Sequence, residues 1–416
     1  MLSVREASDA ILDGLAPLAL ERVALRDALG RVLATPIVAP LTLPAWDNSA
    51  MDGYAVRAID IEHARAESPV TLRVIDSVAA GAFAARAVSA GTAIRIMTGA
   101  PLPEGADTVV RVEDSDGGLA VVAIRNGRDA RKNVRPRGED VREGDVVLAR
   151  GQPIGAAQIG VLSSLGAATI DVFRRPRVAF LGSGDELVDI DRFDEVMAGR
   201  KIVSSNSYTL HAMIRAAGGE PVDLGVAMDD PADLRERLER SAGCDLLITS
   251  AGISVGEFDY VRDVLRSLGT EMKFWRVRMR PGAPLGFGVL NGMPWIGLPG
   301  NPVSTMVTFE LFVRPVIRRM LGHERLFRRT VRVVLEEPVT IGATLMHFFR
   351  AIVTPRADGM LAARLTGGQG SGILTSMSLA NALLVVPEDK PRSEAGETML
   401  AILLGDEAQL TTRLEL

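Results

Sequence analysis

A regular alternation of short apolar runs and amphipathic helical patterns, between residues 173 and 324, most constrains how this chain can fold. The runs "RVAFL" (177–181), "PVDLGVAM" (221–228) and "CDLLI" (244–248) are each followed by a segment whose apolar residues recur at three- and four-residue spacing. Alternating strands and helices are typical of a parallel sheet covered by helices on both faces. We therefore predict a parallel α/β domain over residues 173–324, with a further strand over 274–279 and a hairpin marked by Asn291–Gly292.

The other segments predict three further parts. Residues 46–140 contain short β-runs separated by Gly, Pro and Asp, which predict an inserted β-rich module. Residues 1–45 and 141–172 carry helical patterns and predict a partly helical elongated domain. The patterns include Ser3 and Glu6 at capping-box spacing and "ALRDALGRVLA" at 24–34. Residues 325–416 return to short strands and predict a small C-terminal β-barrel or sandwich. The expected fold class is a multi-domain α/β and β protein.

Composition excludes several functional classes. A net charge of −5 and a pI near 5.6 provide no overall field that attracts nucleic acid or an anionic membrane. The first residues lack the apolar core of a signal peptide, and no apolar run is long enough to cross a bilayer. A single cysteine, Cys244, excludes an internal disulfide. We expect a cytoplasmic protein with no nucleic-acid or membrane partner.

The histidines form no recognisable metal or catalytic pattern. All four, His63, His211, His323 and His347, lie far apart in the sequence and have no ligand partner at helical spacing. A zinc site is therefore not indicated. We interpret each histidine as a surface or hydrogen-bonded residue.

Polar residues follow the predicted strands of the α/β domain. Ligands of an open parallel sheet bind beyond the carboxyl ends of its strands. Hydroxyls and glycine amides suit phosphate oxygens, whereas carboxylates beside a phosphate need a hard cation such as Mg²⁺ between them. The sequence thus predicts a phosphate and metal site at this edge. The candidates are Ser183, Asp185, Glu186, Asp229, Ser250, Ser254, Asp259, Arg280, Asn301 and Ser304.

Each of these loops also has a purely structural interpretation. A single glycine-rich loop between a strand and a helix is more often only a turn, and "GSGDEL" (182–187) lacks the third glycine of the dinucleotide fingerprint. Asp230 is placed to cap a helix, and so is Asp259. The convergence of several polar loops at one predicted edge favours a binding site.

Seven ordered motifs extend over almost the whole chain. They are "LPAWDNSAMDGYAV" (43–56), "RIMTGAPLPEGADTVVRVED" (95–114), "NVRPRGEDVREGDVVLARG" (133–151), "GSGDEL", "TSAGISVGEFDY" (249–260), "RMRPGAPLGFG" (278–288) and "GLPGNPVS" (297–304). Together with "GGQGSGILTSMSLANALLVVP" (367–387), they resemble the motifs of the molybdopterin molybdenumtransferase family, to which the catalytic domain of gephyrin-type proteins is similar.

This resemblance implies an activity and an assembly. Members of the family take molybdopterin–AMP and molybdate, hydrolyse the adenylate with Mg²⁺, and leave molybdenum on the dithiolene, which is the last step of molybdenum-cofactor biosynthesis. The resemblance implies a homodimer in which Asp52 and Thr98 of one subunit complete the cleft of the other. The implied further partners are molybdopterin adenylyltransferase and the molybdoenzymes that receive the cofactor.

The resemblance also implies roles for individual residues. Arg350 and Ser376 match positions associated with molybdate. The implied metal ligands are Glu186, Asp229 and Asp259. The implied catalytic residues are Asp185, Glu186, Asp229, Asp259 and Arg280. The implied cofactor-binding residues are Asp52, Thr98, Ser183, Gly184, Ser250, Gly252, Ser254, Gly256, Asn301, Ser304, Arg350 and Ser376.

Two departures from the family pattern keep other functions open. The family commonly has two glycines where this chain has Ala251–Gly252, and Lys-Pro-Gly-Lys-Pro where this chain has Arg280-Pro-Gly-Ala283-Pro. The acidic set favours an active enzyme. The absence of a lysine at 283, in a loop that we expect to be exposed, favours a non-catalytic paralogue that binds or carries molybdopterin or the finished cofactor. A binding module for another phosphorylated small molecule is the third possibility.

Overall fold

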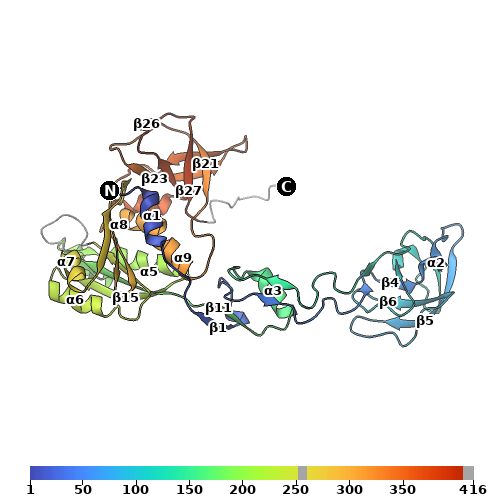
Figure 1. The fold of residues 1–416 in the computed structure, drawn as a ribbon. Coiled ribbons are helices and arrows are strands. Elements are labelled where there is room, and N and C mark those ends of the chain that lie inside the picture. Colours follow the sequence, from blue (N-terminus) through green and yellow to red (C-terminus); the bar gives the residue numbers. More distant parts are fainter. Residues whose placement is uncertain (252–259, 406–416) are drawn as a thin grey trace. The chain divides into compact units, whose positions relative to one another are not determined.

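The computed structural model describes residues 1–251 and 260–405. The chain divides by its internal contacts into two compact units, each with sheets of its own (Figure 1). One unit contains residues 1–34, 151–155 and 169–416, and the other contains residues 35–150 and 156–168.

The second unit is built on a five-stranded sheet, which confirms the predicted β-rich module. The strand order is β7 (Thr108–Arg111), β4 (Gly53–Val56), β6 (Thr92–Ile96), β5 (Val70–Val78) and β8 (Val121–Ile124). Fully buried Tyr54, Ile94 and Val110 are part of its core. The same unit contains β2 (Ile37–Val38) paired with β10 (Val146–Leu148), β3 (Asn48–Ser49) paired with β9 (Val134–Arg135), α2 (Ala58–Ile61), η2 (Val112–Asp114) and α3 (Ala156–Ser164).

The secondary structure predicted for the N-terminal residues of the first unit is only partly confirmed. Helix α1 (Val4–Leu12) begins with the predicted capping box between Ser3 and Glu6. The helix predicted over 24–34 is wrong: β1 (Leu20–Ala24) pairs with β11 (Thr169–Phe173), and only the short turn η1 (Leu25–Asp27) is helical. Val32 and Leu33 instead form bridges with Pro153 and Val172. Pairing with distant segments overrides the local helical pattern.

A six-stranded sheet forms the centre of the first unit and confirms the predicted α/β domain. Its order is β15 (Glu220–Ala227), β12 (Arg177–Ser183), β16 (Leu246–Ser250), β20 (Met293–Leu298), β19 (Pro284–Leu290) and β17 (Glu271–Arg276). The first four strands are parallel, whereas β19 runs antiparallel to both of its neighbours. The hairpin predicted at Asn291–Gly292 joins β19 to β20, with φ of 49° and 86° at these two residues.

Helices cover both faces of this sheet (Figure 1). One face packs on α5 (Ser205–Ala217), α8 (Pro302–Thr308), the π-helical turn η4 (Phe309–Val313) and α9 (Arg314–Met320), and the other on α6 (Pro231–Glu239) and α7 (Tyr260–Ser267). Buried leucines such as Leu238 and Leu265 each contribute about 1.5–3 kcal/mol. The predicted cap Asp230 accepts hydrogen bonds from two amides of the first turn of α6. Short elements complete this domain: β13 (Leu187–Val188), η3 (Ile190–Arg192), α4 (Phe193–Met197) and β14 (Ile202–Val203).

The C-terminal segment forms a closed five-stranded barrel, as predicted. The ring consists of β23 (Met346–Pro355), β24 (Leu361–Leu365), β21 (Thr330–Leu335), β27 (Thr398–Leu403) and β25 (Ala382–Val386), closed by pairing of β23 with β25. The strand predicted over 274–279 is split, because β17 ends at Arg276 and β18 (Met279–Arg280) pairs with β23 of the barrel. Shorter elements here are β22 (Val339–Thr340), β26 (Arg392–Ser393) and α10 (Leu374–Leu379).

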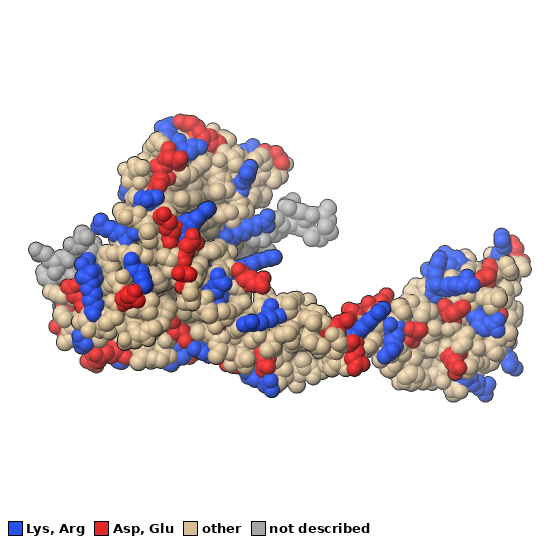
Figure 2. Space-filling view, viewed as in Figure 1, with Lys and Arg blue, Asp and Glu red and all other residues tan. Residues whose placement is uncertain are grey.

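The surface carries charges of both signs. On the face shown in Figure 2, lysine and arginine side chains are interspersed with aspartate and glutamate. Within residues 1–251 and 260–405, no helix is long and apolar enough to span a bilayer.

Candidate active site

The carboxyl ends of the parallel strands bring several candidate residues together. Ser183 is the last residue of β12 and Ser250 the last of β16, and both are buried. In the sheet register, Gly182 lies beside Ser250 and Ser183 lies beside Ala227. These ends meet at one edge because all four strands run in the same direction.

A cavity of about 400 Å³, which we call the central cavity, lies at this edge. Its lining includes the predicted residues Glu186, Ser250 and Asn301. It also includes Ser204, Ser205 and Asn206 at the start of α5, which the sequence analysis missed.

The first residues of α5 line the central cavity and are held in place by hydrogen bonds to neighbouring segments. Asn206 Nδ2 donates to Ser250 Oγ over 2.8 Å and to the Gly300 carbonyl over 2.7 Å, so it ties the helix to two neighbouring loops. The N-cap residue is Ser204, and its side chain does not accept a hydrogen bond from the backbone amides of the first helical turn. A helix N-terminus of this kind favours an anionic group. The signal in the sequence was "SSNS" directly before a helical pattern.

Carboxylates lie beside this edge, after β12 and β15. Asp185 Oδ1 accepts a hydrogen bond of 3.0 Å from the Asp229 amide. Burial raises the pKa of the Asp229 carboxyl, and the negative charges of Asp185 and Glu186 raise it further, while the Asp185 amide opposes them. Gly184, at φ 142°, allows the Glu186 carboxylate to approach, because a Cβ there would lie 2.5 Å from Oε2.

A metal ion at these groups would need ligands from the substrate as well as from the protein. Among the described residues, no three His, Cys, Asp or Glu side chains lie close enough together to hold a metal by themselves. Mg²⁺ commonly uses only one or two carboxylates together with substrate phosphates. Burial and the negative charges of Asp185 and Glu186 raise the pKa of Asp229, and a divalent cation bound there would favour its ionised form. The candidates Gly252, Ser254, Gly256 and Asp259 lie outside the described residues.

A second cavity of about 310 Å³, the basic cavity, adjoins the first through the shared residues Pro284 and Asn301. Its described lining contains no Asp or Glu. Predicted residues Arg280, Ser304 and Arg350 line it, together with His347 and Gln369.

The loop at 281–283 is less exposed than the sequence suggested. Pro281 and Gly282 are buried and Ala283 is half-buried in the wall of the basic cavity, so the expectation of an exposed loop is wrong. The reason is close packing on α8: a Cβ on Gly282, at φ 101°, would lie 2.4 Å from Thr308 Cγ2.

Arg350 is a buried cation whose hydrogen-bond acceptors among the described residues are all neutral. The residue is 1% exposed, and burial lowers the pKa of its guanidinium. Nε donates to Ser376 Oγ over 2.9 Å, and Nη1 and Nη2 donate to carbonyls of residues 368–370. Ser376 in turn donates to the Ile373 carbonyl over 2.7 Å. These four bonds use four of the five N–H donors and leave one on Nη1. An uncompensated buried charge of this sign favours an anionic ligand.

Asp52 and Thr98 contact each other in the second unit. The amide and the hydroxyl of Thr98 both donate to Asp52 Oδ1 over 2.7 Å. These bonds hold the pKa of Asp52 below its usual range, so this carboxylate is ionised at neutral pH. Antiparallel pairing of β4 with β6, which places Gly53 beside Ile96, brings the two residues together.

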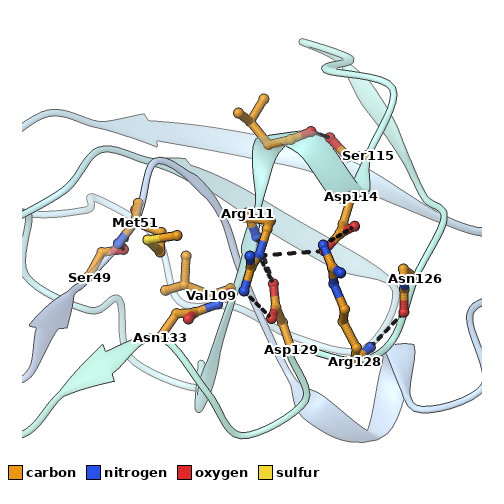
Figure 3. A network of polar contacts seen from close by, with 11 residues as sticks. Ser49, Met51, Val109, Arg111, Asp114, Ser115, Asn126, Arg128, Asp129 and Asn133 are labelled. Atoms are coloured by element: carbon orange, nitrogen blue, oxygen red, sulfur yellow. Dashed lines mark hydrogen bonds and ion pairs between the residues drawn. The ribbon is translucent and has the colours of Figure 1, made fainter.

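An ion-pair network anchors the strand next to Asp52 (Figure 3). Arg111 binds the buried Asp129 through Nε and Nη2 at 2.9 and 3.0 Å, and Arg128 binds Asp114 at 2.7 and 2.9 Å. Arg111 pairs with Gly53 in the sheet, and the next amide donates to the Asp52 carbonyl over 3.0 Å. The backbone on which Asp52 lies is therefore fixed from both sides.

Three family models match the chain in succession. They describe the MoeA N-terminal region (domain I and II) at residues 2–166, a probable molybdopterin binding domain at 179–319, and the MoeA C-terminal region (domain IV) at 332–404. A molybdopterin molybdenumtransferase 2 of Mycobacterium tuberculosis is 40% identical over 380 residues, which are 90% of this chain and 92% of that protein. The chain belongs to the MoeA family.

Other members of the MoeA family support the same assignment. A molybdopterin molybdenumtransferase of Nostoc is 36% identical over 92% of this chain and 88% of that protein. The solved structure of a molybdopterin biosynthesis moeA protein from Pyrococcus horikoshii OT3 matches with a TM-score of 0.84 at 30% identity, and covers 97% of this chain and 100% of that one. The four-part fold described above is thus the MoeA fold.

Ala251 has a backbone conformation that favours glycine. It follows β16 directly and has φ of 76°. We expect Ala251→Gly to raise the free energy of unfolding by about 0.5–1 kcal/mol, because a left-handed alanine is strained. Ala212→Gly, at an exposed position within α5, is the matched control and should lose about 1 kcal/mol. Thermal melting compares the two variants, and a lower melting temperature for Ala251→Gly would contradict the strain.

The second prediction concerns Arg350. Lysine keeps the charge but cannot reach the Ser376 hydroxyl and the carbonyls of residues 368–370 at once. We expect Arg350→Lys to lower the free energy of unfolding by about 2–4 kcal/mol, because buried acceptors lose a charged donor. Urea denaturation measures the loss, with Arg364→Lys, at an exposed barrel position, as control. Equal stability of both variants would show that the loop does not depend on the guanidinium.

Proposed function

We propose that this protein inserts molybdenum from molybdate into molybdopterin, with Mg²⁺-dependent hydrolysis of molybdopterin–AMP. The observation that carries the proposal is the separation of charge at the sheet edge. Carboxylates of Asp185, Glu186 and Asp229 lie beside one part of the cleft, and Arg280 and Arg350 line the adjoining basic cavity. A site for a metal-bridged phosphate and a site for an oxyanion need opposite charges in this way.

The central cavity suits the phosphates of the pterin substrate. Amides of the first turn of α5 and the Ser250 hydroxyl are neutral donors, which bind phosphate oxygens without adding charge. Glu186 and Asp229, with Asp259 beyond the described residues, would hold the metal, and Asp185 lies beside them. When bound, Mg²⁺ supplies neutralisation of charge on the phosphate oxygens and orientation of the attacking water.

The basic cavity suits molybdate, a dianion. Arg280 is exposed at its mouth and can donate from two parallel N–H groups to two oxygens. Arg350 offers the remaining Nη1 donor from the wall. The shared residues Pro284 and Asn301 make the two cavities neighbours, so an oxyanion in one lies beside a pterin in the other.

A non-catalytic carrier of molybdopterin or of the finished cofactor is the second candidate. The observation in its favour is Ala283, which lines the basic cavity with a methyl group where the family commonly has lysine. The acidic side of the cleft has no evident use in a carrier, and for this reason we favour the enzyme. Supply of substrate by molybdopterin adenylyltransferase, delivery to molybdoenzymes and a cytoplasmic location belong to the same proposal.

The direct test is turnover. The protein is incubated with molybdopterin–AMP, molybdate and Mg²⁺, and released AMP and molybdenum-loaded cofactor are measured. We expect both products with Mg²⁺ and neither with a chelator. Binding of molybdopterin without release of AMP would instead support the carrier.

The substitution Asp229→Asn distinguishes a role of this carboxylate in metal binding from a role in stability. Because the folded pKa of Asp229 is raised, its ionised form costs stability above that pKa, and the cost is relieved as the pH falls through it. Without Mg²⁺ at neutral pH, the variant should therefore melt no lower than the wild type, yet it should lose most AMP release and the Mg²⁺-dependent rise in melting temperature. Asp263→Asn on α7, whose side chain is 77% exposed, is the control. Unchanged Mg²⁺ dependence in Asp229→Asn would exclude this carboxylate as a ligand.

Subunit mixing tests the shared site. If the cleft of one subunit is completed by Asp52 of the other, Asp52→Ala and Asp229→Ala proteins should each be inactive as homodimers. Heterodimers of the two should recover up to about half of the wild-type AMP release, because one of two clefts is intact. Sedimentation verifies the dimer, and no recovery in verified heterodimers would argue for a site within one chain.

Ala283→Lys tests the missing cation. The ammonium would add a charge-assisted contact, and we expect molybdate binding to tighten by about tenfold. Ala283→Met has similar length without the charge, so it isolates the electrostatic effect. Since the position is half-buried, both variants should lose some stability, in contrast to the expectation for an exposed loop. Equal molybdate affinities for both variants, measured by calorimetry, would show that position 283 does not face the anion.

A further inference from the structure

His347 lies in the wall of the basic cavity, on a strand that no sequence motif marked. It is the second residue of β23 and lies opposite Arg280 of β18 and Val386 of β25. The residue is 2% exposed, so it is not the surface histidine that the sequence allowed. It is nevertheless among the residues that line the cavity, so its small exposed part faces that space.

The hydrogen bond of the ring fixes its tautomer. Nδ1 lies 2.7 Å from the Leu345 carbonyl oxygen. A carbonyl only accepts, so Nδ1 carries the proton, and Nε2 of the neutral ring has a free lone pair. The described residues give Nε2 no hydrogen-bond partner. A ring nitrogen without a protein partner, on a residue that lines a cavity, is available to a ligand.

The charged groups around the ring are almost all positive. On β18, Arg280 is the register partner of His347. Arg278, just before β18, is paired with Glu388, which follows β25. Arg350 lies three residues along β23. Arg364 of β24 is opposite Ile352, further along the barrel, and α10 carries no charged residue. An anion in the cavity therefore meets two arginines and an imidazole, with no lining carboxylate among the described residues.

We propose that His347 is a further binding residue for the oxyanion of this cavity and takes up a proton at Nε2 when a dianion binds. The proton comes from solvent, and the resulting imidazolium donates Nε2–H to an oxygen of the anion while Nδ1–H stays on the Leu345 carbonyl. Molybdate binding is then coupled to protonation of the protein. The inference rests on the proposed function, because molybdate is the dianion that the function assigns to this cavity.

The sign of the coupling follows from the environment of the ring. Burial lowers the pKa of His347, and the charge of Arg280 lowers it further, while the hydrogen bond to the Leu345 carbonyl opposes them. The net shift is downward, so the free protein holds the ring neutral at pH 7. A bound dianion favours the imidazolium and raises that pKa. Between the two values, binding takes up a proton, and affinity increases as the pH falls from the bound pKa toward the free one.

Calorimetric titration with molybdate, in buffers of different ionisation enthalpy at about pH 6, 7 and 8, measures the proton uptake of the wild type. We expect an uptake that approaches one proton within this range, and an affinity that weakens as the pH rises. Sulfate, a dianion without transferable metal, should show the same uptake if it binds. Binding of molybdate with no proton uptake would overturn the inference and leave the proposed function standing, whereas no binding of molybdate would overturn both.

His347→Gln assigns the proton to this ring. Glutamine does not titrate, so we expect proton uptake to fall nearly to zero and affinity at pH 6 to drop by about tenfold. His63→Gln, at an exposed position in the second unit, is the matched control and should keep the wild-type uptake. The same uptake in His347→Gln would place the proton elsewhere and overturn the inference.

A measurement on the wild type covers the case in which His347→Gln does not fold. The chain has four histidines, so ¹⁵N-resolved imidazole spectra contain few signals to assign. At pH 7, addition of molybdate should move one histidine from the neutral Nδ1–H pattern to the imidazolium pattern. Four unchanged rings at saturating molybdate would contradict the proposal.

Discussion

The pairing of β18 with β23 is the interaction on which the candidate site depends. Two residues, Met279 and Arg280, leave the edge of the parallel sheet and add to the barrel, where they lie beside Met346 and His347. This parallel pairing joins the loop after β17 to the wall of another domain. Without it, Arg280 and Arg350, which are 70 positions apart in sequence, would have no common cavity.

The same arrangement divides the chemistry of the cleft. Carboxylates follow β12 and β15 toward one end of the strand order, where burial and the charges of Asp185 and Glu186 raise the pKa of Asp229. Cations are held on the other side, beyond β19 and β20, where the barrel contributes Arg350. Low local dielectric strengthens both fields, so a metal and an oxyanion are each attracted to their own side. A chain that binds a metal-bridged phosphate next to molybdate needs this separation.

Local sequence patterns predicted helix caps and turns correctly, but they did not predict which distant segments pair or pack together. The capping box at Ser3, the cap at Asp230 and the Asn291–Gly292 turn depend on neighbouring residues, and the structure has all three. The helix expected at 24–34 failed because bridges to residues far along the chain replaced it. The prediction that the loop at 281–283 is exposed was wrong because no neighbouring residue in the sequence indicates that Gly282 packs on Thr308. His347 and Asn206 were missed for the same reason: their importance arises from the strands and loops that surround them.

Crystals soaked with tungstate and Mn²⁺, electron-rich substitutes for molybdate and Mg²⁺, test the division of the cleft most directly. Anomalous scattering at the two absorption edges locates each ion independently. We predict tungsten in the basic cavity, within hydrogen-bond distance of Arg280, Arg350 and His347, and manganese beside Glu186 and Asp229. Tungsten among the carboxylates, or at the start of α5 with the basic cavity empty, would contradict the account.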